Sequence, residues 1–582
     1  MTKRNYKGSL RLDWINKDLS LYYEVDEKEG KGVRPVWVQK NDIRVAEPRI
    51  LRFAKNYGDA TSENMLIKGD NLLVLRSLVE MFKGKKDEDK VKCIYIDPPF
   101  NTGNAFKYYD DNLQHSEWLT MMRDRVYLLR KLLKKDGVFF VHIDEQEQAY
   151  LKVLLDEIFG RDNYLTTITV KSKTPSGVGQ ESHIFSITEF IHVYAKDKKV
   201  AEKFNYKIDD ELVDEKSRTS KNYNILIKDY GKNIFLKELK TGKGNPIKVC
   251  KVQNFKTQKQ SQATRTQEWY FKNYDRIFRL SPANGGLMKK ITPLLPKGDC
   301  CIEYVPTKGK YANKSIKVYF VNRDMVVMLN GSARIDKRNK SVIKTVNVHN
   351  NWTDESLWQG ISREGGVEFK NSKKPEKLIQ RILEMTTNAG ELVFDSFAGS
   401  GTTGAVAHKM GRRWIMVEIG KHAEELIISR IQKVVSGKDQ SGISKELNWN
   451  GGGGFKYYQL GDSIIHEQDM NWKLKAEEMA EAVFLHFQYR PVKAEWLEKE
   501  NMYLGRHQSA RYHFALSFAS REIKTITEDL YEKIVAGLDK EKFKHLTIFT
   551  NVAVAVPPDS FDKERILVKK IPAAILREYN LL

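Results

Sequence analysis

The stretch Cys93-Ile94-Tyr95-Ile96-Asp97-Pro98-Pro99-Phe100-Asn101 decides how the fold of this chain is interpreted. Its apolar first part, from Cys93 to Ile96, predicts a buried strand. Two prolines follow Asp97, and proline cannot continue a strand because it lacks the backbone N–H and fixes φ. The sequence therefore predicts a carboxylate, a rigid turn and an aromatic ring at the carboxyl end of a core strand. In open α/β sheets this is where ligands bind.

The residues after this strand have the chemistry needed to hold an exocyclic amine. The Asp97 carboxylate and the Pro98 carbonyl accept hydrogen bonds, the Pro98-Pro99 rings restrict their direction, and Phe100 can stack on a planar ring. Together they would hold the amine of a base rotated out of a duplex, with its lone pair aimed at an electrophile. The alternative is a plain turn after a core strand, since Asp-Pro is common in turns.

A second motif, 298 positions after Asp97, favours the functional interpretation: Glu391-Leu-Val-Phe-Asp-Ser-Phe-Ala-Gly-Ser-Gly-Thr-Thr403. A predicted strand ends near Asp395, and a Gly-x-Gly turn leads into a helix at Thr402. Glycine lets a ligand approach the backbone, and the first turn of a helix offers unpaired N–H groups. The next predicted strand, 413–419, ends with Glu418, where an acidic residue can bind ribose hydroxyls. Alone, this pattern predicts a generic nucleoside site.

Two further segments carry candidate ligand contacts. Residues 65–82 predict a strand, a turn and a helix, with Asp70 either as the N-cap of that helix or as a ligand contact; the sequence leaves both open. Lys374 precedes Pro375, which suits the first turn of a helix, so this lysine should lie near an N-terminus that favours anions. We also expect helices over about 116–135 and 421–435, the first ended by Gly137.

Composition favours a nucleic-acid partner and offers little support for other classes. The 98 lysines and arginines outnumber the 76 aspartates and glutamates, which gives a net charge of +22 and suits phosphate contacts, although solubility alone is the alternative. Four cysteines without a C-x-x-C pair form neither a disulfide framework nor a zinc site. His142 and Asp144 are interpreted as structural, so no metal is expected. No signal peptide or membrane-length apolar run is found, so a cytoplasmic location without a membrane partner is expected.

Changes in composition along the chain predict five parts. The segment 196–348 is lysine-rich with scattered aromatic residues, which suits an inserted domain facing DNA; a solvated structural insertion is the alternative. The four glycines 451–454 predict a linker or a sharp crossing. The parts are an N-terminal extension (1–60), a first half of an α/β core (61–195), the insertion (196–348), a second half of the core (349–440) and a C-terminal α/β domain (441–582).

Taken together, the two motifs resemble those of DNA amino-methyltransferases that use S-adenosylmethionine. The catalytic motif comes first and the cofactor motif second, which is the order of the permuted beta class. Further segments resemble the modification (Mod) subunits of type III restriction-modification systems: Gly69-Asp-Asn71, Asn101-Thr-Gly103, 369–378 and 451–457. The resemblance covers about 60–200 and 350–460, and it implies a Rossmann-like methyltransferase core with circularly permuted motifs, an inserted target-recognition domain and a C-terminal α/β domain.

The resemblance also implies roles for individual residues. Asp97, Pro98 and Pro99 would orient the target amine and Phe100, where the family usually has tyrosine, would stack on the flipped base. Asp97 favours adenine, because cytosine-amino enzymes usually carry serine there. The implied cofactor contacts are Asp70 to the adenine, Lys374 to the methionine carboxylate, Asp395 near the methionine end, Glu418 to the ribose, and Phe397, Ala398, Gly399, Gly401 and Thr402 around the ligand.

The implied activity is methylation of adenine N6 in duplex DNA by base flipping, within a restriction-modification or related phage-defence system. The implied partners are duplex DNA, a second copy of the chain in a homodimer, and a restriction (helicase-nuclease) subunit. Three alternatives stay open: a solitary DNA methyltransferase, a DNA-recognition module with weak catalysis, and methylation of cytosine N4 or of RNA.

Overall fold

The computed structural model describes most of the chain as two compact units, Met1–Phe204 with His349–Leu582 and Asn205–Val348. The predicted motifs at 102–103 and 369–372 lie outside the described residues. No helix in the described parts is long and apolar enough to cross a membrane. The description leaves out 1–9, 26–32, 102–113, 174–183, 185, 202–203, 205, 242–243, 284–285, 308–312, 338, 355–356, 359, 368–372, 467–468, 493–501, 519–524, 540–541, 553, 555–563 and 579–582.

The first unit is built on a ten-stranded sheet in the order β20-β7-β8-β6-β5-β21-β22-β4-β23-β3. Its centre is parallel and consists of β6 (Leu133–Ile143), β5 (Val91–Ile96), β21 (Leu392–Asp395), β22 (Arg413–Glu418) and β4 (Met65–Lys68). Every residue of β5 and β21 is buried, as expected of parallel strands covered on both faces. The predicted Rossmann-like α/β fold is therefore confirmed.

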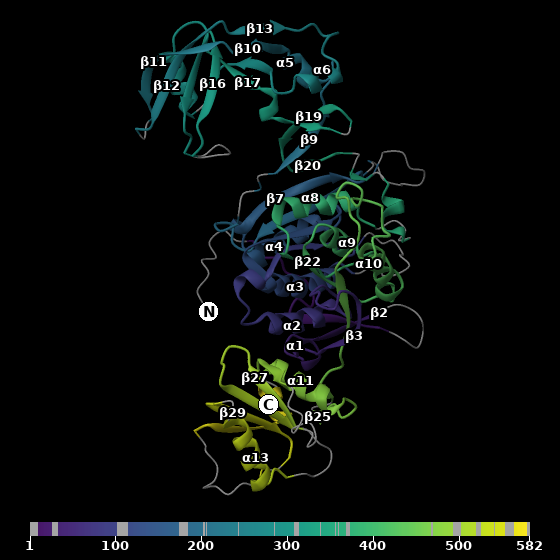
Figure 1. The fold of residues 1–582 in the computed structure, drawn as a ribbon. Coiled ribbons are helices and arrows are strands. Elements are labelled where there is room, and N and C mark those ends of the chain that lie inside the picture. Colours follow the sequence, from purple (N-terminus) through teal and green to yellow (C-terminus); the bar gives the residue numbers. More distant parts are fainter. Residues whose placement is uncertain are drawn as a thin grey trace. The chain divides into compact units, whose positions relative to one another are not determined.

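Helices join the parallel strands and form two groups (Figure 1). In one group α2 packs on α3 and α3 on α4, and in the other α9 packs on α8 and α10. The helix predicted over about 116–135 is α3, and its expected end at Gly137 is wrong. Leu133 already pairs with Val91 as the first residue of β6. The bounds are α2 (Asn71–Phe82), α3 (His115–Leu132), α4 (Gln148–Phe159), α8 (Glu376–Thr386), α9 (Thr402–Lys409) and α10 (Ile428–Val435), the last preceded by a π-helical turn (Ala423–Ile427).

The core sheet takes strands from outside the two segments predicted for it. β3 (Leu51–Gly58) comes from the predicted N-terminal extension and β23 (Gly454–Leu460) from the predicted C-terminal domain. β23 pairs in parallel with β4 and antiparallel with β3. Gly451, Gly452 and Gly453 have positive φ angles and turn the chain back into the sheet, so this glycine run is a sharp crossing. The remaining strands are β8 (Thr188–Ala195), β7 (Tyr164–Lys171) and β20 (Asn351–Trp352), and β20 forms the other edge of the sheet.

Besides the two-stranded pair of β24 (Ile465–His466) and β25 (Asp469–Met470), two smaller sheets belong to the same unit. One is a hairpin of β1 (Leu19–Val25) and β2 (Val33–Gln39). The other is a five-stranded mixed sheet with its own apolar core. Its elements are β26 (Tyr489–Val492), β27 (Met502–His507), β28 (His513–Phe518), β29 (His545–Thr550) and β30 (Ile566–Lys570), with α11 (Ala476–His486), α13 (Glu528–Asp539) and α14 (Ala573–Glu578).

The second unit contains an antiparallel sheet in the order β11-β12-β15-β16-β17-β14-β10-β13 and a smaller sheet, β18-β19-β9. Its strands are short, and its apolar residues form three small clusters instead of one core. The strands are β9 (Lys207–Leu212), β10 (Ile225–Asp229), β11 (Lys232–Lys240), β12 (Pro246–Gln253), β13 (Lys256–Lys259), β14 (Ile277–Ser281), β15 (Cys300–Tyr304), β16 (Ile316–Val321), β17 (Asp324–Met328), β18 (Ala333–Asp336) and β19 (Ser341–Asn347).

Candidate active site

Four neighbouring parallel strands carry predicted acidic site residues at their carboxyl ends. In the sheet order β5-β21-β22-β4, Asp97 follows β5, Asp395 ends β21, Glu418 ends β22 and Asp70 follows β4. The two motifs meet because Phe394 pairs with Ile94. The carboxyl edge of a parallel sheet is the usual ligand site of this architecture. The fold thus gathers side chains that lie far apart in the sequence.

Asp97 forms an ion pair with a lysine from the second half of the core. Lys374 Nζ lies 3.1 Å from Asp97 Oδ1 and 4.5 Å from the centre of the Phe100 ring. Burial raises the pKa of Asp97, and it outweighs the opposing effect of Lys374. Burial would lower the pKa of Lys374, but Asp97 and Glu189 raise it above its usual value. A cation therefore stays beside the carboxylate across the neutral range.

A buried polar chain stands behind this pair. Lys374 Nζ lies 3.7 Å from Glu189 Oε2, His142 Nε2 lies 2.7 Å from the same oxygen, and Tyr95 Oη lies 2.8 Å from His142 Nδ1. Burial would raise the pKa of Glu189, but Lys374 and His142 hold it far below its usual range. Sequence reasoning missed Glu189; its only signal is an acidic residue in a strand, β8, that is otherwise uncharged apart from His192.

The Asp-Pro-Pro-Phe turn is fixed by groups from α3 and the segment before α4. Trp118 Nε1 donates a 2.7 Å hydrogen bond to the Pro99 carbonyl. Asn101 adopts a left-handed conformation with φ 62°, and its side-chain amide donates to Glu147 Oε1 at 2.8 Å. Because Phe100 lies between these two anchored residues, its backbone is held in place.

The glycine-rich turn is organised by Asp395. Its Oδ1 accepts a hydrogen bond from the Phe397 N–H at 2.9 Å and its Oδ2 one from Thr403 Oγ1 at 2.6 Å. Burial raises the pKa of Asp395 to about 7 in spite of these bonds. Gly401 is the N-cap of α9 with φ 77°, a left-handed conformation, and an added Cβ would lie 2.8 Å from Ile427 Cγ2. Glycine at this position therefore lets the turn pack closely against Ile427 before α9 begins.

Ala398 and Glu418 tie this turn to the neighbouring strand. The Ala398 N–H donates to the Val417 carbonyl. Glu418 Oε2 accepts from the Gly399 N–H at 2.8 Å, while Oε1 accepts from the N–H groups of Ile419 and Gly420. A carboxylate oxygen has two acceptor positions, so Oε2 retains one for a further donor.

Asp70 is fully engaged within the protein. It caps α2, where its Oδ1 accepts from the N–H groups of Leu72 and Leu73. Its Oδ2 accepts from the Tyr23 N–H at 3.0 Å and from Arg125 at 2.9 Å. The N-cap role is confirmed. A contact from Asp70 to a ligand stays a prediction, and it would require one of these four donors to move.

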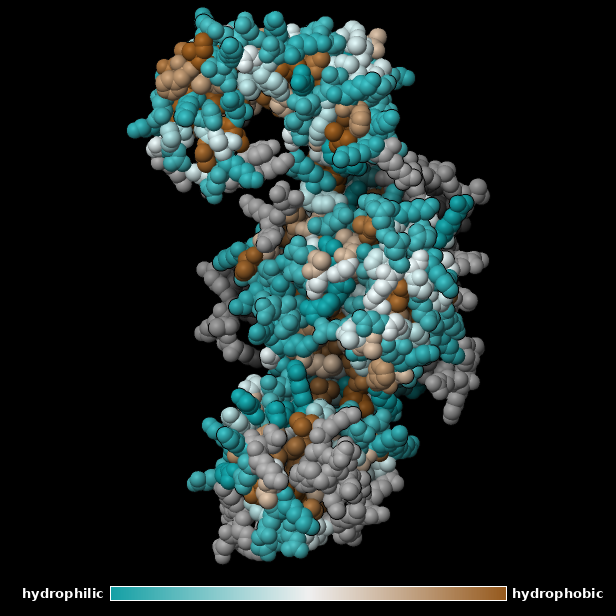
Figure 2. Space-filling view, in the orientation of Figure 1, coloured by the Kyte–Doolittle hydropathy of each residue, from teal (hydrophilic) through white to brown (hydrophobic). Residues whose placement is uncertain are grey.

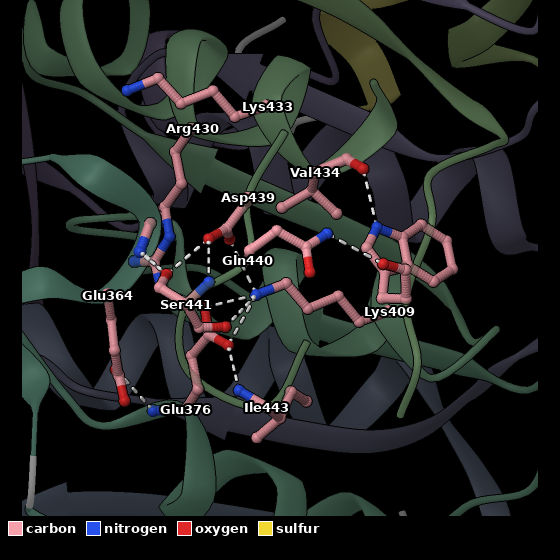
Figure 3. A network of polar contacts seen from close by, with 12 residues as sticks. Glu364, Glu376, Lys409, Arg430, Lys433, Val434, Asp439, Gln440, Ser441 and Ile443 are labelled. Carbon is pink, nitrogen blue, oxygen red and sulfur yellow. Dashed lines mark hydrogen bonds and ion pairs between the residues drawn. The ribbon is translucent and has the colours of Figure 1, made fainter. Parts of the chain in front are cut away.

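A second buried network, drawn around Glu376 in Figure 3, also reaches the glycine-rich turn through Arg430. Arg430 donates to the Ser400 carbonyl at 3.1 Å and to Thr402 Oγ1 at 2.8 Å, and it also bonds Glu376 Oε1 at 2.9 Å. Lys409 Nζ lies 2.8 Å from both Glu376 Oε2 and Asp439 Oδ2. Since Glu376 begins α8, directly after Lys374 and Pro375, the network joins the glycine turn to the segment that carries Lys374.

A cleft of about 1250 Å³ opens beside Asp70. It is lined by the β1–β2 hairpin, the start of α2 and the segment after β23, and it includes Tyr23, Gly69 and Ile419. Its inner wall is thus next to the strand that ends in Glu418. Among the described residues no group of three His, Cys, Asp or Glu side chains is arranged to hold a metal ion.

Comparison with known proteins assigns the family. The family model described as "DNA methylase" matches residues 91–429. The probable type III restriction-modification enzyme HindVI Mod subunit of Haemophilus influenzae is 39% identical over 70% of this chain and 55% of its own length. The type III EcoPI Mod subunit of Escherichia phage P1 is 28% identical over 60% of this chain and 55% of its own length. The chain thus spans about half the length of these relatives.

Solved structures also align with this chain. The cytosine-N4-specific PvuII DNA methyltransferase aligns over 68% of this chain and 94% of its own, with 14% identity and a TM-score of 0.30. The M1.HpyAVI complex with SAM aligns over 63% of this chain and 99% of its own, with 13% identity and a TM-score of 0.27. The match of the family model to residues 91–429 covers more than half of the 582 residues. The chain therefore belongs to the DNA methylase family.

Proposed function

We propose that this chain transfers the methyl group of S-adenosylmethionine to the exocyclic N6 amine of adenine in duplex DNA, as the modification subunit of a type III restriction-modification system. The observation that carries the proposal is the junction of β5 and β21. It brings the turn from Asp97 to Phe100 next to the glycine-rich turn; in our proposal the first binds the target amine and the second the nucleoside of the cofactor. Membership of the DNA methylase family and the similarity to Mod subunits support it.

The residues of the glycine-rich turn fit the cofactor. The first turn of α9, which starts at the left-handed Gly401, would offer its N–H groups to the ligand, and the remaining acceptor position of Glu418 suits a ribose hydroxyl. Phe397 and Ala398 would pack against the ligand, with Asp395 and Lys374 towards its methionine end. Bound there, the cofactor supplies an electrophilic methyl group on a sulfonium.

The Asp97 turn would make the target amine a better nucleophile. The nitrogen lone pair of adenine N6 is delocalised into the ring. When the Asp97 carboxylate and the Pro98 carbonyl accept hydrogen bonds from the amine, the lone pair becomes localised and points at the methyl group. Phe100 would hold the flipped base by stacking. The contribution of the protein is thus orientation and electrostatics.

Charge supports the second unit as the DNA-reading domain. Residues 205–348 contain 30 lysines and arginines and 13 aspartates and glutamates, so they carry +17 of the net charge of +22. Such a surplus suits phosphate contacts. Asp97 in the catalytic motif favours adenine over cytosine. We also propose a homodimer in which residues after β23 contribute to self-association or to docking of a restriction subunit.

The test is transfer of labelled methyl groups by the purified full chain to duplex DNA, single-stranded DNA and RNA of one sequence. Digestion of the products to nucleosides separates N6-methyladenine from N4-methylcytosine. We expect N6-methyladenine from duplex DNA and no label with the Asp97→Ala variant. Label in RNA alone, in cytosine alone, or equal label with Asp97→Ala would each contradict the proposal.

A further inference from the structure

The edge strand of the large sheet in the second unit exposes an apolar run that its own fold does not use. Eight of the nine residues of β11, Lys232–Lys240, are exposed, and only Leu239 is half-buried. Ile234 is 43%, Phe235 60% and Leu236 45% exposed. Among the large apolar residues exposed in the described parts of the chain, these are the only three in a row. Figure 2 shows the apolar patch at the upper left, at the β11 end of the sheet.

The hairpin partner of β11 does not share this exposure. In β12, Pro246–Gln253, exposed residues alternate with the buried Ile247, Val249 and Val252. β12 therefore forms part of the sheet core, whereas β11 projects beyond it. A register shift between Phe235 and Lys237 leaves Leu236 out of the pairing, and such a bulge increases the local twist.

Lysines surround the apolar run. Lys232, Lys237 and Lys240 on β11 and Lys248 and Lys251 on β12 are all exposed. Lysines by themselves would only guard an edge strand against pairing with other strands. Three exposed apolar side chains in the same strand have the opposite effect, because a long apolar edge invites association. A surface with both features fits a partner that is anionic at its rim and apolar within.

Duplex DNA has these properties in its major groove. The groove is wide enough for a two-stranded β-ribbon, it is bordered by phosphates, and the C5-methyl group of thymine is its apolar contact. We propose that the β11–β12 hairpin enters the major groove of the target and that Ile234, Phe235 and Leu236 read thymine methyl groups there. The lysines named above then contact the flanking phosphates. The inference deepens the proposed function and rests on it, since it takes duplex DNA as the substrate.

Removing the methyl groups from the DNA gives the direct test. Deoxyuridine in place of thymidine removes the C5-methyl group and keeps base pairing. The probe is a labelled duplex with the recognition sequence, identified from the adenines that the wild-type chain methylates, and a copy with deoxyuridine at each thymidine in turn. We expect at least one position where deoxyuridine weakens binding about fourfold, the factor for burying one such carbon group.

The protein variants complete a double-mutant cycle. In Ile234→Ser/Phe235→Ser/Leu236→Ser, affinity should fall and the difference between thymidine and deoxyuridine should disappear. Leu294→Ser is the matched control, because Leu294 is 53% exposed in the same unit but lies outside the hairpin. Lys237→Gln/Lys240→Gln should weaken all duplexes alike and reduce the salt dependence of binding.

Three outcomes would overturn the inference. One is wild-type binding that is insensitive to deoxyuridine at every position. Another is a triple variant that keeps the thymidine preference. The third is a triple variant that only loses self-association in light scattering, which would assign the strand to a protein interface. If the wild-type chain methylates no DNA, the proposed function fails. Binding to random duplexes with thymidine or deoxyuridine throughout then still tests the hairpin.

Discussion

Replacing Lys374 by methionine should move the acid side of the pH–rate profile for methyl transfer to higher pH. The proposed mechanism needs Asp97 ionised, because the negative charge strengthens the hydrogen bond that Asp97 accepts from the amine, and protonation turns one of its oxygens into a donor. Burial already raises the pKa of Asp97, and Lys374 is the first of the groups that lower it. Without the ammonium the pKa rises further, so Asp97 is protonated and inactive over a wider range as the pH falls.

The size of the change follows from the ion-pair geometry. At 3.1 Å, two unit charges attract by about 5 kcal/mol at an effective dielectric constant of about 20. Relaxation and solvent reduce this, and a close opposite charge usually lowers the pKa of a carboxyl by roughly one to three units. The acid side of the profile should therefore move up by a similar amount. Just above the wild-type midpoint, the rate should fall by about 10- to 1000-fold.

The assay is single-turnover methyl transfer from pH 5 to 9 at saturating cofactor, with cofactor affinity measured by calorimetry at each pH. Lys374→Arg keeps the positive charge and should keep most of the profile. Lys373→Met is the matched control at the neighbouring position. Lys373 Nζ donates hydrogen bonds to backbone carbonyls, such as that of Glu364 at 2.8 Å, so its loss should leave the acid side of the profile in place. An unmoved acid side in Lys374→Met, with cofactor bound, would refute the role of this ion pair.

Three further changes test other parts of the site. Asp97→Ala should abolish transfer and leave cofactor affinity nearly unchanged, and calorimetry showing complete loss of binding would contradict this. Gly401→Val should weaken cofactor binding and lower stability by about 1–3 kcal/mol in urea melts, because the added Cβ meets Ile427 at 2.8 Å. A chain ending after Leu460 should fold and bind cofactor but be monomeric in light scattering, whereas one ending at Asn450 should unfold because it lacks β23. If the chain ending after Leu460 dimerises as well as the full chain, the residues after β23 have no part in self-association.

The strands that carry the two motifs could be predicted because both are short, mostly apolar and end at residues that stop a strand. The order of those strands could be expected only from the resemblance. Lys374 shows the limit: its sequence position suggested an anion near a helix start, but its contact with Asp97 depends on where α8 lies beside β5. Likewise, no local pattern reveals that Arg125 and the backbone N–H of Tyr23 donate hydrogen bonds to Asp70.

The boundaries of the core were harder to predict for a physical reason. β3 and β23 hold charged and aromatic residues in a mixed burial pattern, so their composition matches the flanking segments better than the apolar central strands. In the second unit, strands such as β11 and β13 are exposed along almost all of their length, so they have no buried face that apolar residues could mark in the sequence. Glu189 could not be recognised from the sequence, because the two side chains that it contacts, His142 and Lys374, are distant from it in the chain.

The place of β21 between β5 and β22 also sets the order in which the protein can assemble on the ribosome. β5 leaves the ribosome roughly 300 residues before β21, its neighbour in the sheet. During that interval the mostly apolar β5 has one side without its partner, while Asn205–Val348 can fold as a separate unit. The central sheet closes only after β23 is synthesised, so the nascent first half is a natural client for chaperones. Slowing translation within the insertion should prolong this exposed state and lower the yield of native protein.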